Sequence, residues 1–244
     1  MKIIALDSSG LVASVAIVRN DCLIAEYNVQ YKKTHSQTLL PMLDEIKRMV
    51  DLDLREVDAI AIASGPGSFT GLRIGSATAK GLGFALDIPL IEIPTLEGLA
   101  YNLYGTDKLV CPMMDARRSQ VYTGIYEFRQ KEAEESRPIA YELRSCKEQC
   151  AIAVEELMGL LNEAGREVIF LGDGVPVYEE KIKECLKVPF VFAPAHMNRQ
   201  RAASLASLAH DYYQKGITVT ASAHAPAYLR LSQAEREKAE RNGN

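Results

Sequence analysis

The chain has 244 residues, a formal net charge of −4 and no tryptophan, with 48% apolar and 25% charged residues. This composition is typical of a globular protein, and the acidic balance with only 7% aromatic residues argues against strong direct binding to nucleic acid. The five cysteines form no C-x-x-C pair and no apolar run reaches membrane length. We therefore expect a cytoplasmic protein with reduced thiols, no zinc site and no membrane contact.

The first half of the chain is predicted to begin with three strands and to continue with alternating helices and strands. Short polar turns separate the first three apolar stretches, which predicts an antiparallel meander. Leu39 and Leu43 recur at helical spacing in the stretch that follows. The predicted order is strands at 2–6, 12–18 and 22–29, a helix at 34–50, a strand at 59–63, a helix at 70–86 and a strand at 90–93.

The second half is predicted to repeat this order. Its elements are strands at 109–114, 121–128 and 139–143, a helix at 147–161, a strand at 167–171, a helix at 176–186 and a strand at 188–192. Both halves are thus β-β-β-α-β-α-β, which predicts a duplicated α/β fold with a cleft between residues 1–105 and 106–232. A further helix at 198–215 should pack back on the first half. We expect an exposed hairpin tip at 131–137 and a charged tail at 233–244.

Residues 64–75, with the sequence SGPGSFTGLRIG, join a predicted strand to a predicted helix. Backbone N–H groups in such a turn favour an anion, but the segment lacks both the Lys-Ser/Thr pair of a P-loop and a G-x-G-x-x-G motif. A second feature lies in the helix, where Gly71, Gly75, Ala79 and Gly83 recur every four residues and so share one face. This ridge of small residues allows close backbone approach, either to the chain's own sheet or helices or to a second protein chain.

The glycine segment resembles the hallmark motif of the bacterial TsaB (YeaZ) family, and the duplicated order is the plan of the actin, sugar-kinase and heat-shock-chaperone (ASKHA) superfamily. Shorter stretches that also resemble the family are ALDSS at 5–9, HS at 35–36, PTLE at 94–97, MDARR at 114–118 and PAYLR at 226–230. The resemblance implies a non-catalytic subunit in the synthesis of N6-threonylcarbamoyladenosine (t6A) in tRNA. It further implies pairing with the TsaD paralogue, which carries the metal and the transferase chemistry, association with the ATPase TsaE, and contact with tRNA through the complex.

The ridge and the resemblance together predict that helices 34–50 and 70–86 dock the paralogue, or form a homodimer when the chain is alone. Arg73 and Arg117 are either surface ion-pair residues or anchors for the partner or a phosphate. The residues expected in the partner interface are Thr34, His35, Leu39, Leu43, Gly71, Arg73, Gly75, Ala79 and Gly83.

The histidines argue against a metal site. The paralogue is expected to hold its metal with H-x-x-x-H, whereas here His35 is followed at that spacing by Leu39, which cannot ligate a metal. The other three histidines are isolated from one another in the sequence. We therefore expect His35 to cap or pack at the start of its helix.

Two turns could hold the phosphates of a nucleotide, as the superfamily plan implies. The first is Asp7-Ser8-Ser9, and the second is Gly172-Asp173-Gly174, with Asp115 at the strand end that corresponds to Asp7. The region after Gly216 has no glycine until Gly243, so the glycine pair that would contact adenosine is missing. We expect a vestigial site, with weak ATP or ADP binding at most, no hydrolysis and no tightly bound cofactor.

Two enzymatic alternatives stay open at this point. The duplicated plan and Asp7 are compatible with an ATP-dependent small-molecule kinase of the same superfamily, which ATP turnover by the pure chain would reveal. A glycoprotease-like metallopeptidase is the other, and stoichiometric metal would support it. A serine protease is disfavoured because the chain has no G-x-S-x-G motif.

Overall fold

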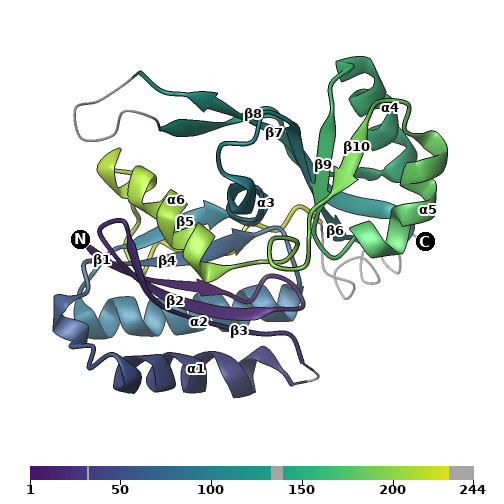
Figure 1. Cartoon of the computed structure of the whole chain (residues 1–244). Coiled ribbons are helices and arrows are strands. Elements are labelled where there is room, and N and C mark those ends of the chain that lie inside the picture. The colour runs from purple at the N-terminus through teal and green to yellow at the C-terminus, as the bar shows by residue number, and fades with distance from the viewer. Residues whose placement is uncertain (32, 133–139, 231–244) are drawn as a thin grey trace.

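The computed structural model describes residues 1–31, 33–132 and 140–230, and it has two lobes, each built on a five-stranded mixed sheet (Figure 1). The strand orders are β3-β2-β1-β4-β5 and β8-β7-β6-β9-β10, so the second sheet repeats the first strand for strand. This repetition confirms the predicted duplicated α/β fold. The strands are β1 (Lys2–Asp7), β2 (Ala13–Arg19), β3 (Cys22–Val29), β4 (Ala59–Gly65), β5 (Leu90–Pro94), β6 (Leu109–Asp115), β7 (Gln120–Gln130), β8 (Tyr141–Ala153), β9 (Val168–Leu171) and β10 (Phe190–Phe192).

Helices cover both faces of the first sheet. Alternate residues of the central strands point to opposite faces, so Ile4 packs toward α1 and α2 while Ile3 packs toward α6. In the second lobe, α4 and α5 cover one face of the sheet and α3 lies against the other, between the lobes. The helices are α1 (His35–Met49), α2 (Phe69–Leu86), α3 (Thr95–Ala100), α4 (Val154–Ala164), α5 (Val175–Cys185) and α6 (Ala202–Gln214), and two short 3₁₀ helices span Leu54–Glu56 and Tyr101–Leu103.

One predicted element is wrong. The helix expected at 147–161 begins only at Val154, because residues 141–153 form the long strand β8. This strand pairs with β7 across two register shifts, from Gln120 opposite Ala153 to Gln130 opposite Tyr141. The pairing with β7 therefore overrides the local pattern of apolar residues. Residue 139, most of the predicted hairpin tip at 131–137 and the tail at 233–244 lie outside the described residues.

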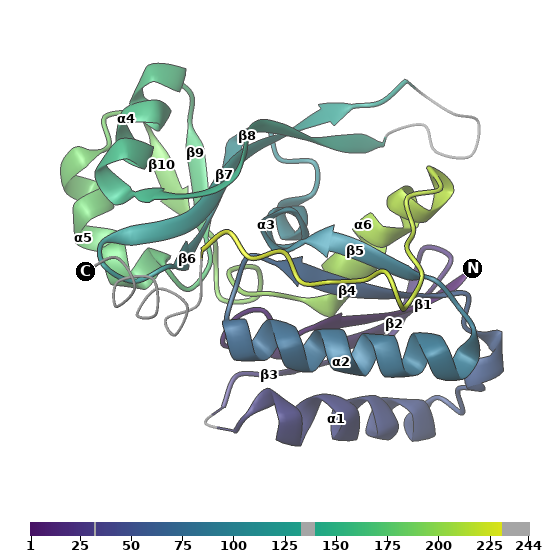
Figure 2. The same cartoon turned by 180° about the vertical axis from the view of Figure 1, so that it is seen from behind.

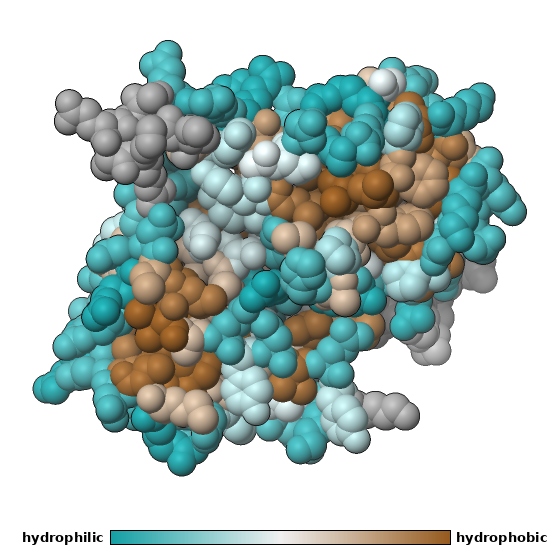
Figure 3. Space-filling model, viewed as in Figure 1, coloured by the Kyte–Doolittle hydropathy of each residue, from teal (hydrophilic) through white to brown (hydrophobic). Residues whose placement is uncertain are grey.

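After α6 the chain returns along the first lobe as an extended segment, which we call the strap (residues 219–230). A bridge between Val219 and Leu90 joins it to the edge strand β5, and Figure 2 shows it crossing above α2 toward the second lobe. None of the described helices is long and apolar enough to span a membrane. Apolar surface is visible over the second lobe (Figure 3), where Val191 in the edge strand β10 is exposed.

Candidate functional site

A cleft of about 560 Å³ lies between the lobes. Its first-lobe wall is formed by the β1–β2 turn, the start of α1 and the glycine loop that leads into α2. The end of β6 and the turn after β9 form the second-lobe wall. The end of the strap also lines the cleft. The cleft thus brings together predicted residues from both turns and both helices, namely Ser9, Thr34, His35, Gly71, Asp115 and Asp173.

The polar side chains of the first predicted phosphate turn form hydrogen bonds within the chain. Asp7 is only 2% exposed, and its Oδ1 accepts hydrogen bonds from the amide (2.9 Å) and the hydroxyl (2.6 Å) of Ser9. Burial raises the pKa of Asp7, and the bonds from Ser9 oppose that rise. Ser8 Oγ donates to the carbonyl oxygen of Gly71 at 2.8 Å. These three side chains therefore hold the turn and tie it to α2.

The glycine loop is pressed directly onto this turn. A Cβ at Gly67 would lie 2.3 Å from the carbonyl oxygen of Ser9, and a Cβ at Gly71 would lie 2.0 Å from that of Ser8. The amide of Ser68 donates to the Ser9 carbonyl at 2.7 Å, and its hydroxyl caps α2 by accepting from the Gly71 amide at 3.3 Å. Contact within the chain thus explains glycine at both positions.

His35 packs at the start of α1, as predicted. Its Nε2 donates to the carbonyl oxygen of Gly10 at 2.9 Å, while its Nδ1 is buried without a hydrogen-bond partner. One helical turn later, Leu39 is 1% exposed and belongs to the core between α1 and the sheet. Thr34 is the exposed N-cap residue and makes no side-chain capping bond. The start of α1 therefore offers one imidazole nitrogen and no second ligand at helical spacing.

The second-lobe wall of the cleft carries two carboxylates. Asp115 Oδ1 accepts from the Arg117 amide (2.9 Å) and the Tyr178 hydroxyl (3.1 Å), and the exposed Arg117 guanidinium lies 3.7 Å from Asp115 Oδ2. The Oδ1 of Asp173 is buried without a hydrogen-bond partner, and burial, together with the nearby charge of Asp115, raises the pKa of Asp173. Three cations, Lys33, Arg117 and Arg230, line the same cleft, so its charges are mixed.

The flanking glycines of the second turn have a packing role. Gly172 has a φ of +107°, and a Cβ there would lie 2.1 Å from the carbonyl oxygen of Met113. Gly174 donates its amide to the same oxygen at 2.9 Å. The turn is thereby fixed against β6, which carries Asp115 at its end.

Six of the residues predicted at the partner interface are buried within the chain. Gly71, Gly75, Ala79 and Gly83 face the chain's own sheet and strap, where a Cβ at Gly83 would lie 2.5 Å from a methyl carbon of Leu90. Leu39 and Leu43 are likewise buried in the core beneath α1. The sheet, the β1–β2 turn and the strap cover these six residues in the single chain, and their contact with a second chain stays a prediction.

A second stripe of small residues, offset by two positions, faces outward from α2. Ala77, Gly81 and Ala85 are exposed, and a Cβ at Gly81 would meet no atom within 4 Å. Phe84 beside them is 63% exposed, and Leu40 on the neighbouring helix α1 is 53% exposed. The two helices lie side by side beneath the first sheet (Figures 1 and 2). The α1–α2 layer therefore presents an outer surface with exposed apolar side chains and a small-residue stripe.

Comparison with known proteins agrees with this architecture. Residues 25–238 match the family model described as TsaD, tRNA N6-adenosine threonylcarbamoyltransferase. The protein named tRNA threonylcarbamoyladenosine biosynthesis protein TsaB from Bacillus subtilis is 33% identical over 96% of both chains. The chain belongs to the TsaB (YeaZ) family. The protein of the same name from Haemophilus influenzae is 38% identical over 50% of this chain and 52% of its own length. The crystal structure of YeaZ from Pseudomonas aeruginosa superposes with a TM-score of 0.75 at 28% identity, covering 93% of this chain and all of that one.

As a member of the TsaB family, the chain can be tested for a metal site of its own. Within residues 1–31, 33–132 and 140–230, no three His, Cys, Asp or Glu side chains gather closely enough to hold a metal ion. His35 has Leu39 at the ligand spacing, and Asp7 is engaged by Ser9. In the described part of the chain the polar groups of the cleft therefore form no set of three metal ligands.

Sequence reasoning noted the family-like stretch at 226–230 but assigned it no role. Ala227 donates its amide to the Ser64 carbonyl at 2.7 Å, and its own carbonyl would lie 2.2 Å from a Cβ at Gly65. The Tyr228 ring lies 4.9 Å from the Phe69 ring, between centroids, and Arg73 stacks on the same Phe69 ring at 4.2 Å. Arg73 thus contacts Phe69 and Tyr228, two aromatic residues that line the cleft.

The strap also links the two lobes. Arg230 donates to the carbonyl oxygen of Ala116 in the second lobe at 2.6 Å. Farther back, the buried His224 pairs through Nδ1 with Glu92 at 2.5 Å, and Lys80 donates to the His224 carbonyl at 2.9 Å. These contacts join single residues that share no fixed spacing in the sequence, so they become visible only in the folded structure.

Proposed function

We propose that this chain is a non-catalytic subunit of the machinery that makes t6A in tRNA. In this role it pairs with a TsaD-type paralogue and stabilises the active conformation of that partner, which is a population shift. The Bacillus subtilis relative that it matches over 96% of both chains is named as a tRNA threonylcarbamoyladenosine biosynthesis protein. The observation that carries the proposal is the buried Leu39 one turn after His35, because it leaves the chain without a pair of metal-ligating histidines.

The outer surface of the α1–α2 layer is the proposed contact with the paralogue. Exposed apolar side chains favour burial against another protein, and the stripe of Ala77, Gly81 and Ala85 allows a partner helix to approach closely. In the absence of the paralogue, the same surface pairs two copies of this chain as an isologous dimer. A TsaE-type ATPase joins the assembly, and tRNA is held by the complex in the cytoplasm.

Nucleotide plays a minor part in this proposal. The hydroxyls of the first turn are occupied by contacts within the chain, and on the facing wall Asp115 accepts hydrogen bonds from Tyr178 and from the amide of Arg117. ATP or ADP therefore binds weakly to the isolated chain, and hydrolysis does not follow.

The test places a bulky residue on the outer stripe, as Gly81→Leu. Since nothing lies within 4 Å of a Cβ there, the variant should fold while its side chain blocks a closely packed partner helix. Gly159→Leu is the matched control, because this glycine of α4 is also exposed and free of neighbours within 4 Å. We expect Gly81→Leu to lose co-purification with the TsaD-type paralogue and t6A formation in a reconstituted reaction, and Gly159→Leu to keep both.

Two results would count against the proposal. Unchanged pairing and modification by Gly81→Leu would exclude this surface. ATP turnover or peptidase activity by the pure chain, lost in Asp7→Asn, would support the kinase or peptidase alternatives in place of a non-catalytic subunit.

A further inference from the structure

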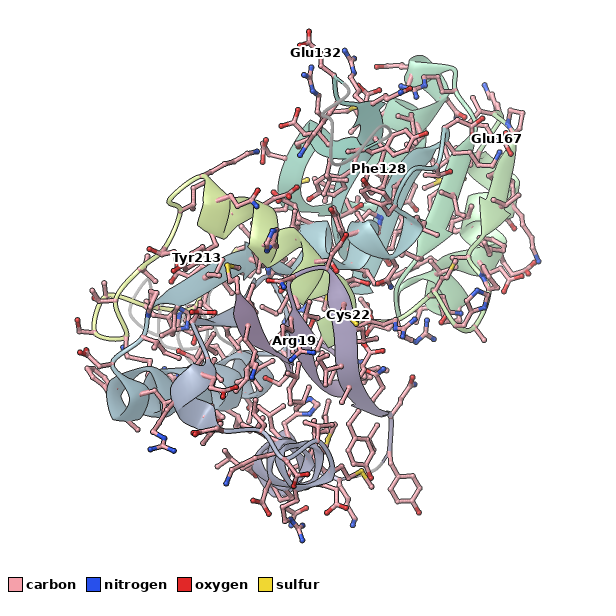
Figure 4. The ribbon with its side chains drawn as sticks, turned by 60° about the vertical axis from the view of Figure 1, so that its left-hand side comes forward. Arg19, Cys22, Phe128, Glu132, Glu167 and Tyr213 are labelled. Carbon is pink, nitrogen blue, oxygen red and sulfur yellow. The ribbon has the colours of Figure 1, made fainter. Side chains whose placement is uncertain are left out.

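A second cavity, of about 220 Å³, lies between the β7–β8 hairpin, α3 and α6, away from the glycine loop. Figure 1 shows the hairpin passing above α6, and Figure 4 shows the strand that carries Phe128 above the helix that carries Tyr213. Both lobes therefore contribute walls. The lining residues that matter below are Glu97, Tyr126, Leu143, Leu208, Tyr212 and Ile217.

Glu97 brings into this cavity a carboxyl group that forms no ion pair with another described residue, although Lys215 also lines the cavity. Its Oε2 accepts a hydrogen bond from the Tyr212 hydroxyl at 2.6 Å. Burial raises the pKa of Glu97, and the negative charge of Glu148 raises it further. No lysine, arginine or histidine in the described part of the chain forms an ion pair with Glu97. A carboxylate removed from water in this way is stabilised by an opposite charge.

The other carboxylates of the lining are already paired. Glu142 lies 3.4 Å from Lys215, and Asp211 lies 3.4 Å from Lys131. Glu97 is therefore the acidic group available to a cationic ligand.

Tyr126 provides a second, independent indication of a ligand. The residue is 1% exposed, and its hydroxyl is buried without a hydrogen-bond partner among the described residues. The charges of Glu97 and Glu148 raise the pKa of Tyr126, beyond the effect of burial, so this hydroxyl lies in the same negative field. Buried polar groups in proteins are nearly always hydrogen-bonded, and an orphaned hydroxyl indicates a missing partner.

We propose that this cavity binds a small aliphatic amine through its ammonium group. Glu97 supplies the charge, and the orphaned oxygen of Tyr126 accepts an N–H bond. The apolar side chains of Leu143, Leu208 and Ile217 contact the methylene groups. A metal ion fits less well, because Glu142 and Asp211 are paired with lysines and the described residues hold no cluster of three metal-ligating side chains.

The test is isothermal titration calorimetry of the full chain with 1,4-diaminobutane, at constant ionic strength. We expect saturable binding, and we expect Glu97→Gln to weaken it about tenfold or more, since one charge-assisted hydrogen bond is lost. Tyr126→Phe should weaken it less. Glu167→Gln is the control, because this carboxylate pairs with Lys108 outside the cavity and should leave binding unchanged.

Two further measurements make the outcome decisive. 1,4-Butanediol, which has the same chain length without charge, should not bind. Carbon-13 NMR of the Glu97 carboxyl should show its pKa fall when the diamine is added, which a merely structural role would not produce. Absence of binding, or equal binding by Glu97→Gln, would overturn the proposal and leave the proposed t6A role untouched, because the two rest on different surfaces.

Discussion

Gly71→Ala is the substitution that most directly tests how the glycine loop is held. The added Cβ would lie 2.0 Å from the carbonyl oxygen of Ser8, about 1.4 Å short of the 3.4 Å at which ordinary contact begins. Because the obstructing atom belongs to the backbone, the start of α2 must move away from the β1–β2 turn. Two hydrogen bonds across this junction are then strained, namely Ser8 Oγ to the Gly71 carbonyl and the Ser68 amide to the Ser9 carbonyl.

The expected destabilisation can be estimated from these contacts. Overpacking a tight site costs about 1–3 kcal/mol, and each hydrogen bond contributes about 1 kcal/mol. Alanine returns up to about 1 kcal/mol through its helix propensity. The free energy of unfolding should therefore fall by about 2–4 kcal/mol, which for a chain of this length lowers the melting temperature by roughly 5–15 °C.

The assay is thermal unfolding followed by circular dichroism, with Gly81→Ala as the control on the same helix. That substitution has the same chemistry but no atom within 4 Å of the new Cβ, so it should raise stability by up to about 1 kcal/mol. If Gly71→Ala is as stable as the wild type, the loop does not depend on this contact and the explanation of the motif fails. If both variants lose stability equally, α2 is sensitive to alanine for another reason.

Three other predictions follow from the electrostatics and from the strap. The raised pKa of Glu97 means that its ionised form destabilises the fold, so the free energy of unfolding falls as pH rises from the ordinary carboxyl pKa to the raised value. In urea unfolding at several pH values, Glu97→Gln should remove this fall. An unchanged pH profile would refute the prediction. The pKa of Glu127 is lowered chiefly by the hydrogen bond from Arg166, so the ionised carboxylate stabilises the fold above its ordinary pKa. This stabilisation disappears as pH falls through the lowered pKa. Glu127→Gln should remove the corresponding fall in the free energy of unfolding at acid pH, and if the fall persists it belongs to other groups. Gly65→Ala should displace the Ala227 carbonyl, 2.2 Å from the new Cβ, and speed hydrogen exchange across residues 219–230; unchanged exchange would show that the strap does not depend on this contact.

Local sequence patterns were sufficient for the first lobe. Its strands alternate or are wholly apolar, its turns are short and polar, and its longer helices have a clear period. Strands β1 to β5 and helices α1, α2 and α6 were therefore found within a few residues of their ends, whereas the short helix α3 was not predicted. The second lobe shows where such patterns fail. Ala151, Val154, Leu157 and Met158 have helical spacing, yet the first of them belongs to β8, because pairing with β7 fixes the backbone before the helix begins.

The candidate cleft was predicted in part for the same reason. Ser9, Asp115 and Asp173 lie at or just after the ends of strands that the sequence marks clearly, so their meeting at the cleft followed from the duplicated topology. The strap could not be found this way, since its contacts join residues such as His224 and Glu92 that are far apart in the sequence and belong to no periodic pattern. The cavity at Tyr126 and Glu97 could not be predicted from the sequence for a similar reason. That a buried hydroxyl lacks a hydrogen-bond partner is known only when all its neighbours have been placed.

The two small-residue stripes of α2 show why a periodic motif does not by itself identify an interface. In the sequence, Gly71-Gly75-Ala79-Gly83 and Ala77-Gly81-Ala85 have the same spacing of four, and the first contains more glycine. Glycine is most necessary where another atom already lies within 3 Å of a would-be Cβ, as it does at Gly71, Gly75 and Gly83 on the inner side of α2. The more glycine-rich stripe therefore marks packing within the protein, and the stripe available to a partner is the one whose glycine no internal contact requires. If α2 docks a sister subunit, its specificity must come from Phe84 and the exposed side chains around Gly81, because the motif that identifies the family is already engaged by the β1–β2 turn.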